Sequence, residues 1–281
     1  FEFEDAVDQL EELIQSACEY RMVADVPIGV FLSGGYDSTA VAATLQNHSS
    51  QPIKTFTIGF TEGNDEAPAA RAIASELGTD HHELYCSPKE ALELIPALPD
   101  IYDEPFADSS GIPTVLVSRM ARNEVKVALS ADGGDELFGG YTSYPATARR
   151  MRYLQSAPAF LRRGMGRPLE SISRILPDVS HRLQHQMDSL ARSLHPDDRI
   201  MAQRLHTNAR LMPARMIDRL LAQTNSGTSE IEDRNWPSGT HTMDACMGID
   251  YQSYLKDDIL TKVDRATMSV GLEGREPILD H

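Results

Sequence analysis

One segment near the start of the chain limits the fold more than any other, because it places a glycine turn between a strand and a helix. The apolar run 26–31 precedes Leu-Ser-Gly-Gly-Tyr-Asp-Ser at 32–38, and the helix-forming run 39–45 follows it. Unpaired backbone N–H groups at a helix start attract anions, and adjacent glycines let the backbone approach a phosphate closely. The segment therefore predicts a polyphosphate site, to which Ser33 and Ser38 add hydroxyl donors.

The charge of this loop separates it from the most familiar nucleotide-binding loop. The chain contains no G-x-x-x-x-G-K-[ST] string, so the lysine of a Walker A loop is missing. Asp37 stands inside the loop instead, where its carboxylate would repel phosphate unless a divalent cation lies between them. The loop therefore predicts Mg²⁺ together with a nucleotide, and an ordinary serine–glycine turn leading into a helix is the alternative.

A second segment concentrates negative charge further along the chain. Asp132, Asp135 and Glu136 lie within five residues and are interrupted by Gly133 and Gly134. Carboxylates so close together cost free energy unless a cation offsets them. The segment predicts either a metal site or a solvated turn in which Asp135 caps the following helix.

The first 145 residues alternate between strand and helix patterns. Hydrophobic periodicity predicts strands at 26–32, 53–60, 81–86 and 125–130, and helices at 3–23, 37–47, 65–78, 88–98 and 112–123. This is a doubly wound α/β pattern, in which ligands bind beyond the carboxyl ends of the strands. Because the polar segments 33–38, 59–66 and 130–136 each follow a strand, we expect them to converge on one crevice.

The remainder of the chain has a different pattern. Residues 146–245 read as a helical subdomain, and residues 246–281 are expected to return to the active site of the 1–145 core. The arginines between 149 and 167 predict a solvated basic face, with contact to a partner domain or an acidic substrate as the alternative. Residues 225–229 predict a loop. At 281 residues, the chain is long enough for one large domain or two moderate ones.

Composition excludes several classes of function. A net charge of -16 argues against nucleic acid as a partner, because affinity for nucleic acid comes from Lys and Arg. The three cysteines form no C-x-x-C pair, so neither zinc nor a disulfide framework is indicated and a reducing compartment is favoured. Without an apolar run of about 18 residues or a leader pattern, no membrane contact is expected, and the predicted location is cytoplasmic.

Four blocks together resemble one known family. They are S-G-G-Y-D-S at 33–38, D-E-P-F-A-D-S-S at 103–110, L-S-A-D-G-G-D-E-L-F-G-G-Y at 129–141 and K-V-D-R-A-T-M-S at 262–269, followed by L-E-G-R-E-P-I-L-D-H at 272–281. The first block is similar to the PP-loop of ATP pyrophosphatases. The whole set resembles the synthetase domain of the class B, glutamine-hydrolysing asparagine synthetases. The resemblance implies a mostly parallel sheet of the adenine nucleotide alpha hydrolase-like type with a helical insertion.

The resemblance also implies roles for individual residues. In the family, the positions of Leu32 and Ile58 bind adenine and ribose through the backbone, with Ser130 and Ala131 alongside, and the pyrophosphate lies on the loop that here contains Ser33, Gly34, Gly35, Asp37 and Ser38. Asp37 and Asp135 match the aspartates that hold Mg²⁺. The position of Asp132 is important for the acyl-adenylate step, although Ala131 here replaces a common glycine.

Two further residues are candidates for catalysis. Lys262 is suited to stabilise the negative charge that develops on the α-phosphate during attack, and one charge of a solvated helix face is the alternative for it. Tyr141 matches a tyrosine that assists proton removal in the β-lactam-forming relatives, whereas an ordinary packed tyrosine needs no such role.

The expected activity is ATP-dependent amidation of a carboxylate through an acyl-adenylate, with release of AMP and pyrophosphate. Aspartate is the expected substrate, and ATP and Mg²⁺ are the expected cofactors. Alternatives are an amidotransferase acting on a sugar uronate or another carboxylate, and a noncatalytic nucleotide-binding domain. The chain begins at Phe1 without the family's glutaminase domain, so we expect a piece of a longer protein. Ammonia then comes from solution or from that domain, and a homodimer is left open.

Overall fold

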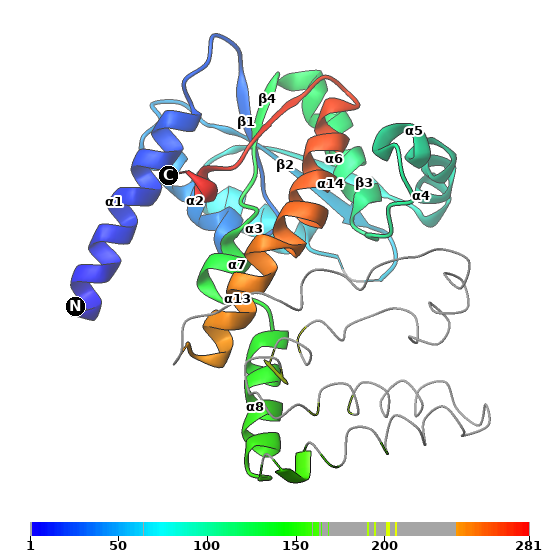
Figure 1. Cartoon of the computed structure of the whole chain (residues 1–281). Coiled ribbons are helices and arrows are strands. Elements are labelled where there is room, and N and C mark those ends of the chain that lie inside the picture. Colours follow the sequence, from blue (N-terminus) through cyan, green and yellow to red (C-terminus); the bar gives the residue numbers. More distant parts are fainter. Residues whose placement is uncertain are drawn as a thin grey trace. The chain divides into compact units, whose positions relative to one another are not determined.

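The computed structural model describes residues 2–63, 65–158 and 240–280, together with residues 160–162, 164, 168, 190, 194, 201, 202 and 206 (Figure 1). The chain divides into two compact units. The first consists of Phe1–Asp135 and Ser253–His281, and the second of Glu136–Gln252. The predicted boundaries at 145 and 245 stay a prediction, and the predicted loop at 225–229 lies outside the described residues.

The first unit is built on a parallel five-stranded sheet. Its strands are β1 (Ile28–Phe31), β2 (Lys54–Phe60), β3 (Asp80–Cys86), β4 (Val127–Leu129) and β5 (Glu273–Arg275), in the order β3-β2-β1-β4-β5. Every neighbouring pair is parallel. The predicted doubly wound α/β fold and its four strands are confirmed. The fifth strand was not predicted, because Glu-Gly-Arg is neither apolar nor rich in strand-forming residues.

Helices follow the strands as the alternating pattern predicted. The first unit contains α1 (Phe3–Arg21), α2 (Tyr36–Asn47), α3 (Ala67–Leu77), α4 (Pro88–Leu94), α5 (Leu98–Tyr102), α6 (Gly111–Glu124) and α14 (Leu260–Met268), with short turns η1 (Ile95–Ala97), η3 (Leu255–Ile259) and η4 (Pro277–Leu279). The single helix predicted at 88–98 is instead divided into α4, η1 and α5. Pro96 and Pro99 are each the second residue of a new helical segment, and the division occurs there because proline cannot donate the hydrogen bond that a continuing helix needs.

The sheet has one apolar layer on each face, because successive residues of a strand point to opposite sides. On one face, Val30 and Leu129 pack with side chains from α1, α2 and α3, namely Cys18, Val41, Ala42, Leu45, Ala70 and Ala74. On the other face, Phe56 and Ala128 pack with Val117 and Ala121 of α6 and with Leu272. Helix α14 lies beside α6 in Figure 1. The central strands are therefore buried on both sides.

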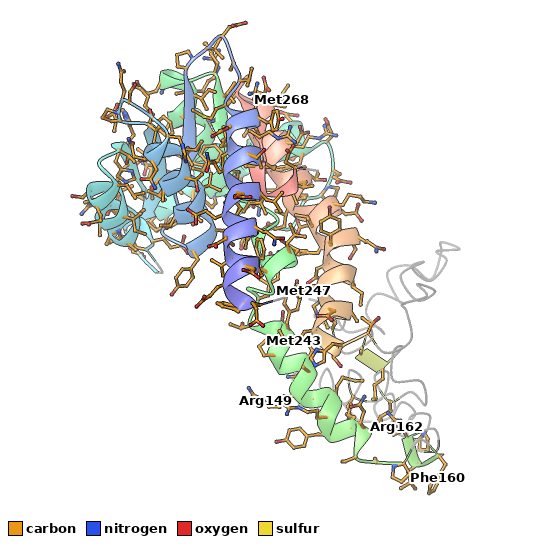
Figure 2. The ribbon with its side chains drawn as sticks, turned by 90° about the vertical axis from the view of Figure 1, so that its left-hand side faces the viewer. Arg149, Phe160, Arg162, Met243, Met247 and Met268 are labelled. Atoms are coloured by element: carbon orange, nitrogen blue, oxygen red, sulfur yellow. The ribbon has the colours of Figure 1, made fainter. Side chains whose placement is uncertain are left out.

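The second unit contains α8 (Ser143–Gln155) and α13 (Thr242–Gln252), and α7 (Gly134–Phe138) spans the division between the units. A polar cluster ties α8 to α13: Tyr144 donates a hydrogen bond to Asp250 at 3.0 Å, and His206 lies 2.8 Å from the same carboxylate. Met243 and Met247 of α13, shown in Figure 2, pack beside Gly139. This part of the second unit is held by a buried polar group as well as by apolar contacts.

The predicted solvated basic face is only partly correct. Arg149 of α8 is exposed, whereas Arg162 is buried and donates a hydrogen bond to the Met201 sulfur at 3.4 Å (Figure 2). Arg163 and Arg167 lie outside the described residues. Burial of an arginine against a thioether places its aliphatic stem in an apolar layer, which a count of charges along the sequence does not reveal.

Two negative findings concern the described part of the chain alone. None of its helices combines the length and the apolar character that crossing a membrane requires. The three cysteines, Cys18, Cys86 and Cys246, are buried and free.

Close contact between β1 and β2 gives a test of the core. A Cβ atom at Gly29 would lie 2.4 Å from the Phe56 ring, which is fully buried and stacks on His82 at 5.2 Å. We expect Gly29→Ala to lower the free energy of unfolding by about 1–3 kcal/mol, because the ring has no free space to enter. Chemical denaturation measures this. In a Phe56→Leu background the cost should shrink, and an equal cost in both backgrounds would contradict the explanation.

Candidate functional site

The loop that follows β1 has the form predicted for an anion site. Ser33 and Ser38 hydroxyls lie 3.0 Å apart, the Ser38 hydroxyl accepts from the Ser33 N–H at 3.2 Å, and Gly35 N–H donates to the Ser33 hydroxyl at 3.3 Å. Helix α2 begins after Gly35 without a side-chain cap. Its first N–H groups are therefore available to a ligand, and the serine hydroxyls are already turned into the loop.

Gly34 is required by the path of this loop. Its φ is +82°, a conformation that residues with a side chain rarely adopt, and a Cβ atom there would lie 3.0 Å from the backbone nitrogen of Ala70 on α3. The loop is thus pressed against the start of a second helix. This close packing fixes the course of the chain between Ser33 and Asp37.

The acidic turn begins where the neighbouring strand ends. Strand β4 pairs with β1 in parallel, with Val30 opposite Leu129, so the two loops leave the same edge of the sheet from adjacent strands. Within the turn, the Ser130 hydroxyl donates to the Asp132 carboxylate, and Gly133 has a φ of +96°. The predicted convergence of the 33–38 and 130–136 segments is therefore a property of the strand order.

The third polar segment, 59–66, also follows a strand that pairs with β1 in parallel, so it leaves the same edge of the sheet. Asp65 accepts hydrogen bonds from the backbone N–H groups of Phe60 and Ala67, at 3.3 and 3.1 Å. Its carboxylate thus joins the end of β2 to the first turn of α3. Asn64 lies outside the described residues. Asp65 therefore has a structural role in its own turn, and a contact of the 59–66 segment with a ligand stays a prediction.

Asp37 and the acidic turn lie in direct contact. A Cβ atom at Gly134 would lie 2.4 Å from the Asp37 carboxyl carbon, so only glycine leaves room for this side chain. Burial and the charge of Asp135 raise the pKa of Asp37. Burial and the charge of Asp132 in turn raise the pKa of Asp135. Each carboxylate is therefore ionised at a cost that a cation would remove.

The residues present fit a Mg²⁺ ion that is shared with a ligand. Among the described residues, no group of three or more His, Cys, Asp or Glu side chains is arranged to hold a metal ion. Mg²⁺ commonly uses only one or two carboxylates and takes its other ligands from water and from substrate phosphates. Asp37 and Asp135 supply that number, beside an anion-binding loop.

Lys262 is buried, which rules out the solvated helix face considered for it. The residue is 7% exposed, and its ammonium group donates to Asp108 at 2.8 Å and to the Ser110 hydroxyl at 2.7 Å. It comes from α14, whose other buried residues, including Val263 and Ala266, fix the orientation of the helix. A buried ammonium with these partners is held in one place.

Asp108 and Ser110 were not predicted as site residues, although they belong to the 103–110 block. The Ser110 hydroxyl and backbone N–H both donate to Asp108 at 2.8 Å. Burial opposes ionisation of Asp108, but the hydrogen bonds and charge of Lys262, with the bonds from Ser110, lower its pKa below the usual value. The signal in the sequence was an aspartate and a serine two residues apart, a pattern that a turn alone also explains.

Asp132 interacts electrostatically with both Asp108 and Lys262. Burial and the charge of Asp108 raise its pKa, while the Ser130 hydroxyl and the charge of Lys262 act in the opposite direction. Asp258, in the π-helical turn η3, has a pKa raised by burial and by Asp108, against the opposing charge of Lys262. The positive charge of Lys262 thus favours the ionised forms of three carboxylates, those of Asp108, Asp132 and Asp258. Asp258 was not predicted from the sequence as a site residue.

The remaining predicted residues occupy varied positions. Leu32 donates its N–H to the Phe56 carbonyl at 2.9 Å and accepts at its carbonyl from Thr57. Ile58 pairs with Leu84 between β2 and β3, and Ala131 packs on the apolar layer of β1. Their nucleotide contacts stay a prediction. Tyr141 belongs to the second unit, where its hydroxyl donates to Glu136 at 2.8 Å, and its catalytic role also stays a prediction.

Comparison with known proteins identifies similar chains. The model of the asparagine synthase family matches residues 9–281. A Mycobacterium tuberculosis protein with the provisional name asparagine synthetase (glutamine-hydrolysing) is 36% identical, over 97% of this chain and 40% of its own length. Asparagine synthetase (glutamine-hydrolysing) 1 of Bacillus subtilis is 29% identical, over 98% and 42%. The chain thus spans about two fifths of the length of these relatives.

The Lys262–Asp108 pair gives a test of the site's stability. We expect Asp108→Asn to lower the free energy of unfolding by about 3 kcal/mol, because it leaves a buried ammonium group without its counter-charge. Asp103→Asn is the matched control, since Asp103 pairs with Arg265 on the surface and its side chain is 71% exposed. Urea denaturation at neutral pH compares the two. Equal losses would contradict the explanation.

The same pair has a defined pH dependence. The pKa of Asp108 is lower in the folded than in the unfolded chain, so its ionised form stabilises the fold at neutral pH. This contribution is lost as the pH falls below about 4, through the folded-state pKa. The difference in unfolding free energy between the wild-type chain and Asp108→Asn should therefore disappear on acidification. A difference that persists or grows at low pH would refute the assignment.

Proposed function

Because the chain belongs to the asparagine synthase family, we propose that it catalyses ATP-dependent amidation of a carboxylate, with aspartate as substrate and asparagine as product. One observation carries the proposal. The anion loop after β1 and the acidic turn after β4 leave adjacent parallel strands at the same sheet edge, and Asp37 of the first loop contacts Gly134 of the second. The donors that would bind a polyphosphate and the carboxylates that would bind its cation thus come from neighbouring loops, which supports the proposal.

The first step joins the substrate carboxylate to the α-phosphorus of ATP. A carboxylate oxygen forms the new O–P bond as the bond to the pyrophosphate oxygen breaks. The pyrophosphate leaves on the uncapped N–H groups at the start of α2 and on the serine hydroxyls of the 33–38 loop. Asp37 and Asp135 would hold Mg²⁺, which neutralises phosphate charge when bound. Lys262 stabilises the negative charge on the non-bridging oxygens of the α-phosphate.

The second step forms the amide. Ammonia attacks the carbonyl carbon of the acyl-adenylate, the bond to the AMP oxygen breaks, and nitrogen loses a proton. Asp132 is suited to accept this proton, because burial and the charge of Asp108 raise its pKa above that of an ordinary aspartate. Lys262 lies close enough to Asp132 to favour its ionised form before the transfer. Tyr141 keeps its proposed role in proton removal.

We propose that ammonia comes from glutamine hydrolysis in the longer protein. The two relatives described above carry names that include glutamine hydrolysis, and the chain spans about two fifths of their length. No residue of this chain is assigned to that reaction. ATP, Mg²⁺, aspartate and ammonia are accordingly the ligands proposed for the residues described.

The function is tested by Mg²⁺-dependent release of pyrophosphate from ATP, with ammonium and a panel of aspartate, glutamate and uronic acids. We expect release with aspartate, accompanied by equal amounts of AMP and asparagine. Release with another carboxylate alone would replace the substrate, and tight ATP binding without release from any member would favour a noncatalytic domain.

Removing single charges from the site tests the catalytic roles proposed for Asp37, Asp135 and Lys262. Asp37→Ala and Asp135→Ala should each lower the rate of pyrophosphate release by at least about a hundredfold, because they remove the carboxylates proposed to hold Mg²⁺. Lys262→Met should cost about 10²–10³-fold in kcat through lost charge stabilisation. Lys256→Met is the matched control, since the Lys256 side chain is 69% exposed and belongs to the preceding turn. A similar loss in both lysine variants would argue against the role of Lys262.

A further inference from the structure

The segment after β5 holds the acidic turn from one side. Ser130 donates its N–H to the carbonyl of Arg275 at 2.9 Å, which continues the pairing of Leu129 with Arg275 in the sheet. A Cβ atom at Gly133 would lie 2.4 Å from the Leu279 side chain. The segment 275–279 therefore lies beside the acidic turn at both of its ends.

Glu276 lies between these two contacts and is an unusual residue for the position. Its Oε2 atom is buried and has no hydrogen-bond partner. The charged groups that face it are Asp132 and Arg21, and the backbone N–H of Asp132 favours its ionised form. A buried carboxyl group with an unmatched oxygen costs stability, and an apolar side chain of similar size would avoid this cost.

The surroundings of Glu276 favour the neutral form of its carboxyl group over the charged form. Burial and the carboxylate of Asp132 raise its pKa well above the usual value, although Arg21 acts in the opposite direction. A neutral carboxyl group can accept the N–H of Asp132 without adding repulsion to an already acidic turn. The chemistry of the side chain therefore suits a contact to the backbone of the turn.

Arg21 fixes this segment from the end of α1. Its guanidinium group pairs with Asp280 at 2.6 Å, and its backbone carbonyl accepts from Arg275 at 2.7 Å. The Arg21 Nε atom is buried without a hydrogen-bond partner, as Oε2 of Glu276 is. The segment carrying Glu276 is thus anchored to α1 on both sides of that residue.

We propose that Glu276 is a positioning residue, whose buried carboxyl group contacts the backbone of Asp132 and holds that side chain in the geometry needed for amide formation. The proposal rests on the proposed function, because the task of Asp132 is assigned there. It adds a residue that neither touches the substrate nor belongs to the metal-binding pair. The loss of folding stability caused by burying Glu276 is then what accompanies a fixed position of Asp132.

Three variants test the proposal. Glu276→Leu should lower kcat for pyrophosphate release with aspartate on the order of tenfold, the effect of leaving one buried donor unsatisfied, while KM for ATP changes less than about twofold. Its melting temperature should equal or exceed that of the wild-type chain. Glu276→Gln keeps a neutral acceptor and should restore kcat. Glu273→Leu is the control, because the Glu273 side chain is 59% exposed and lies on β5, the strand that immediately precedes Glu276.

Backbone exchange supplies a readout that does not depend on activity. Hydrogen–deuterium exchange of the peptide covering 130–135 should be faster in Glu276→Leu than in the wild-type, Glu276→Gln and Glu273→Leu chains. The positioning role is overturned by wild-type kcat or wild-type exchange in Glu276→Leu, or by a Glu276→Gln variant as slow as Glu276→Leu. If the wild-type chain releases no pyrophosphate with any carboxylate, the proposed function fails, and exchange alone decides whether Glu276 holds the turn.

Discussion

The parallel pairing of β1 with β4 is the contact on which the rest of the site depends. Residues far apart in the sequence, Asp37 and Asp135, become neighbours because their strands are neighbours and run in the same direction. A strand inserted between these two would separate the loops by a further inter-strand spacing of about 4.8 Å. Apolar packing on both faces of the sheet therefore maintains a polar arrangement at its edge, and the core and the site cannot be considered separately.

An excess of negative charge is the second constraint on this edge. The carboxylates Asp37, Asp132, Asp135 and Asp258 all have raised pKa values, with burial as the largest cause in each. Lys262 offsets part of this charge, but its hydrogen bonds are made to Asp108 and Ser110. Such an arrangement is unfavourable in the free protein and becomes favourable when a cation is added, so stability is given up to prepare the site for binding.

Local patterns predicted much of the fold and only part of the site. The strand before Ser33 follows from its continuous apolar run and the helix after it from helix-forming residues, and the glycine loop between them follows from its residue types. Strand β5 was not predicted, because its own residues do not favour a strand and it is defined by its pairing with β4. Asp108 was not predicted, because its significance arises from Lys262, a residue that the fold brings to it from the other end of the first unit's sequence.

The π-helical turn Leu255–Ile259 helps to set the direction in which the Lys262 side chain points. A π-turn accommodates one more residue than an α-turn, and one residue of α-helix corresponds to a rotation of about 100°. Helix α14 therefore enters the fold with a phase set by that extra residue, and this phase directs Lys262 toward Asp108 and Ser110. A related chain with the same lysine but one residue fewer in this turn would present it on a different side of the helix. The spacing before α14 is thus as much a part of the site as the lysine itself.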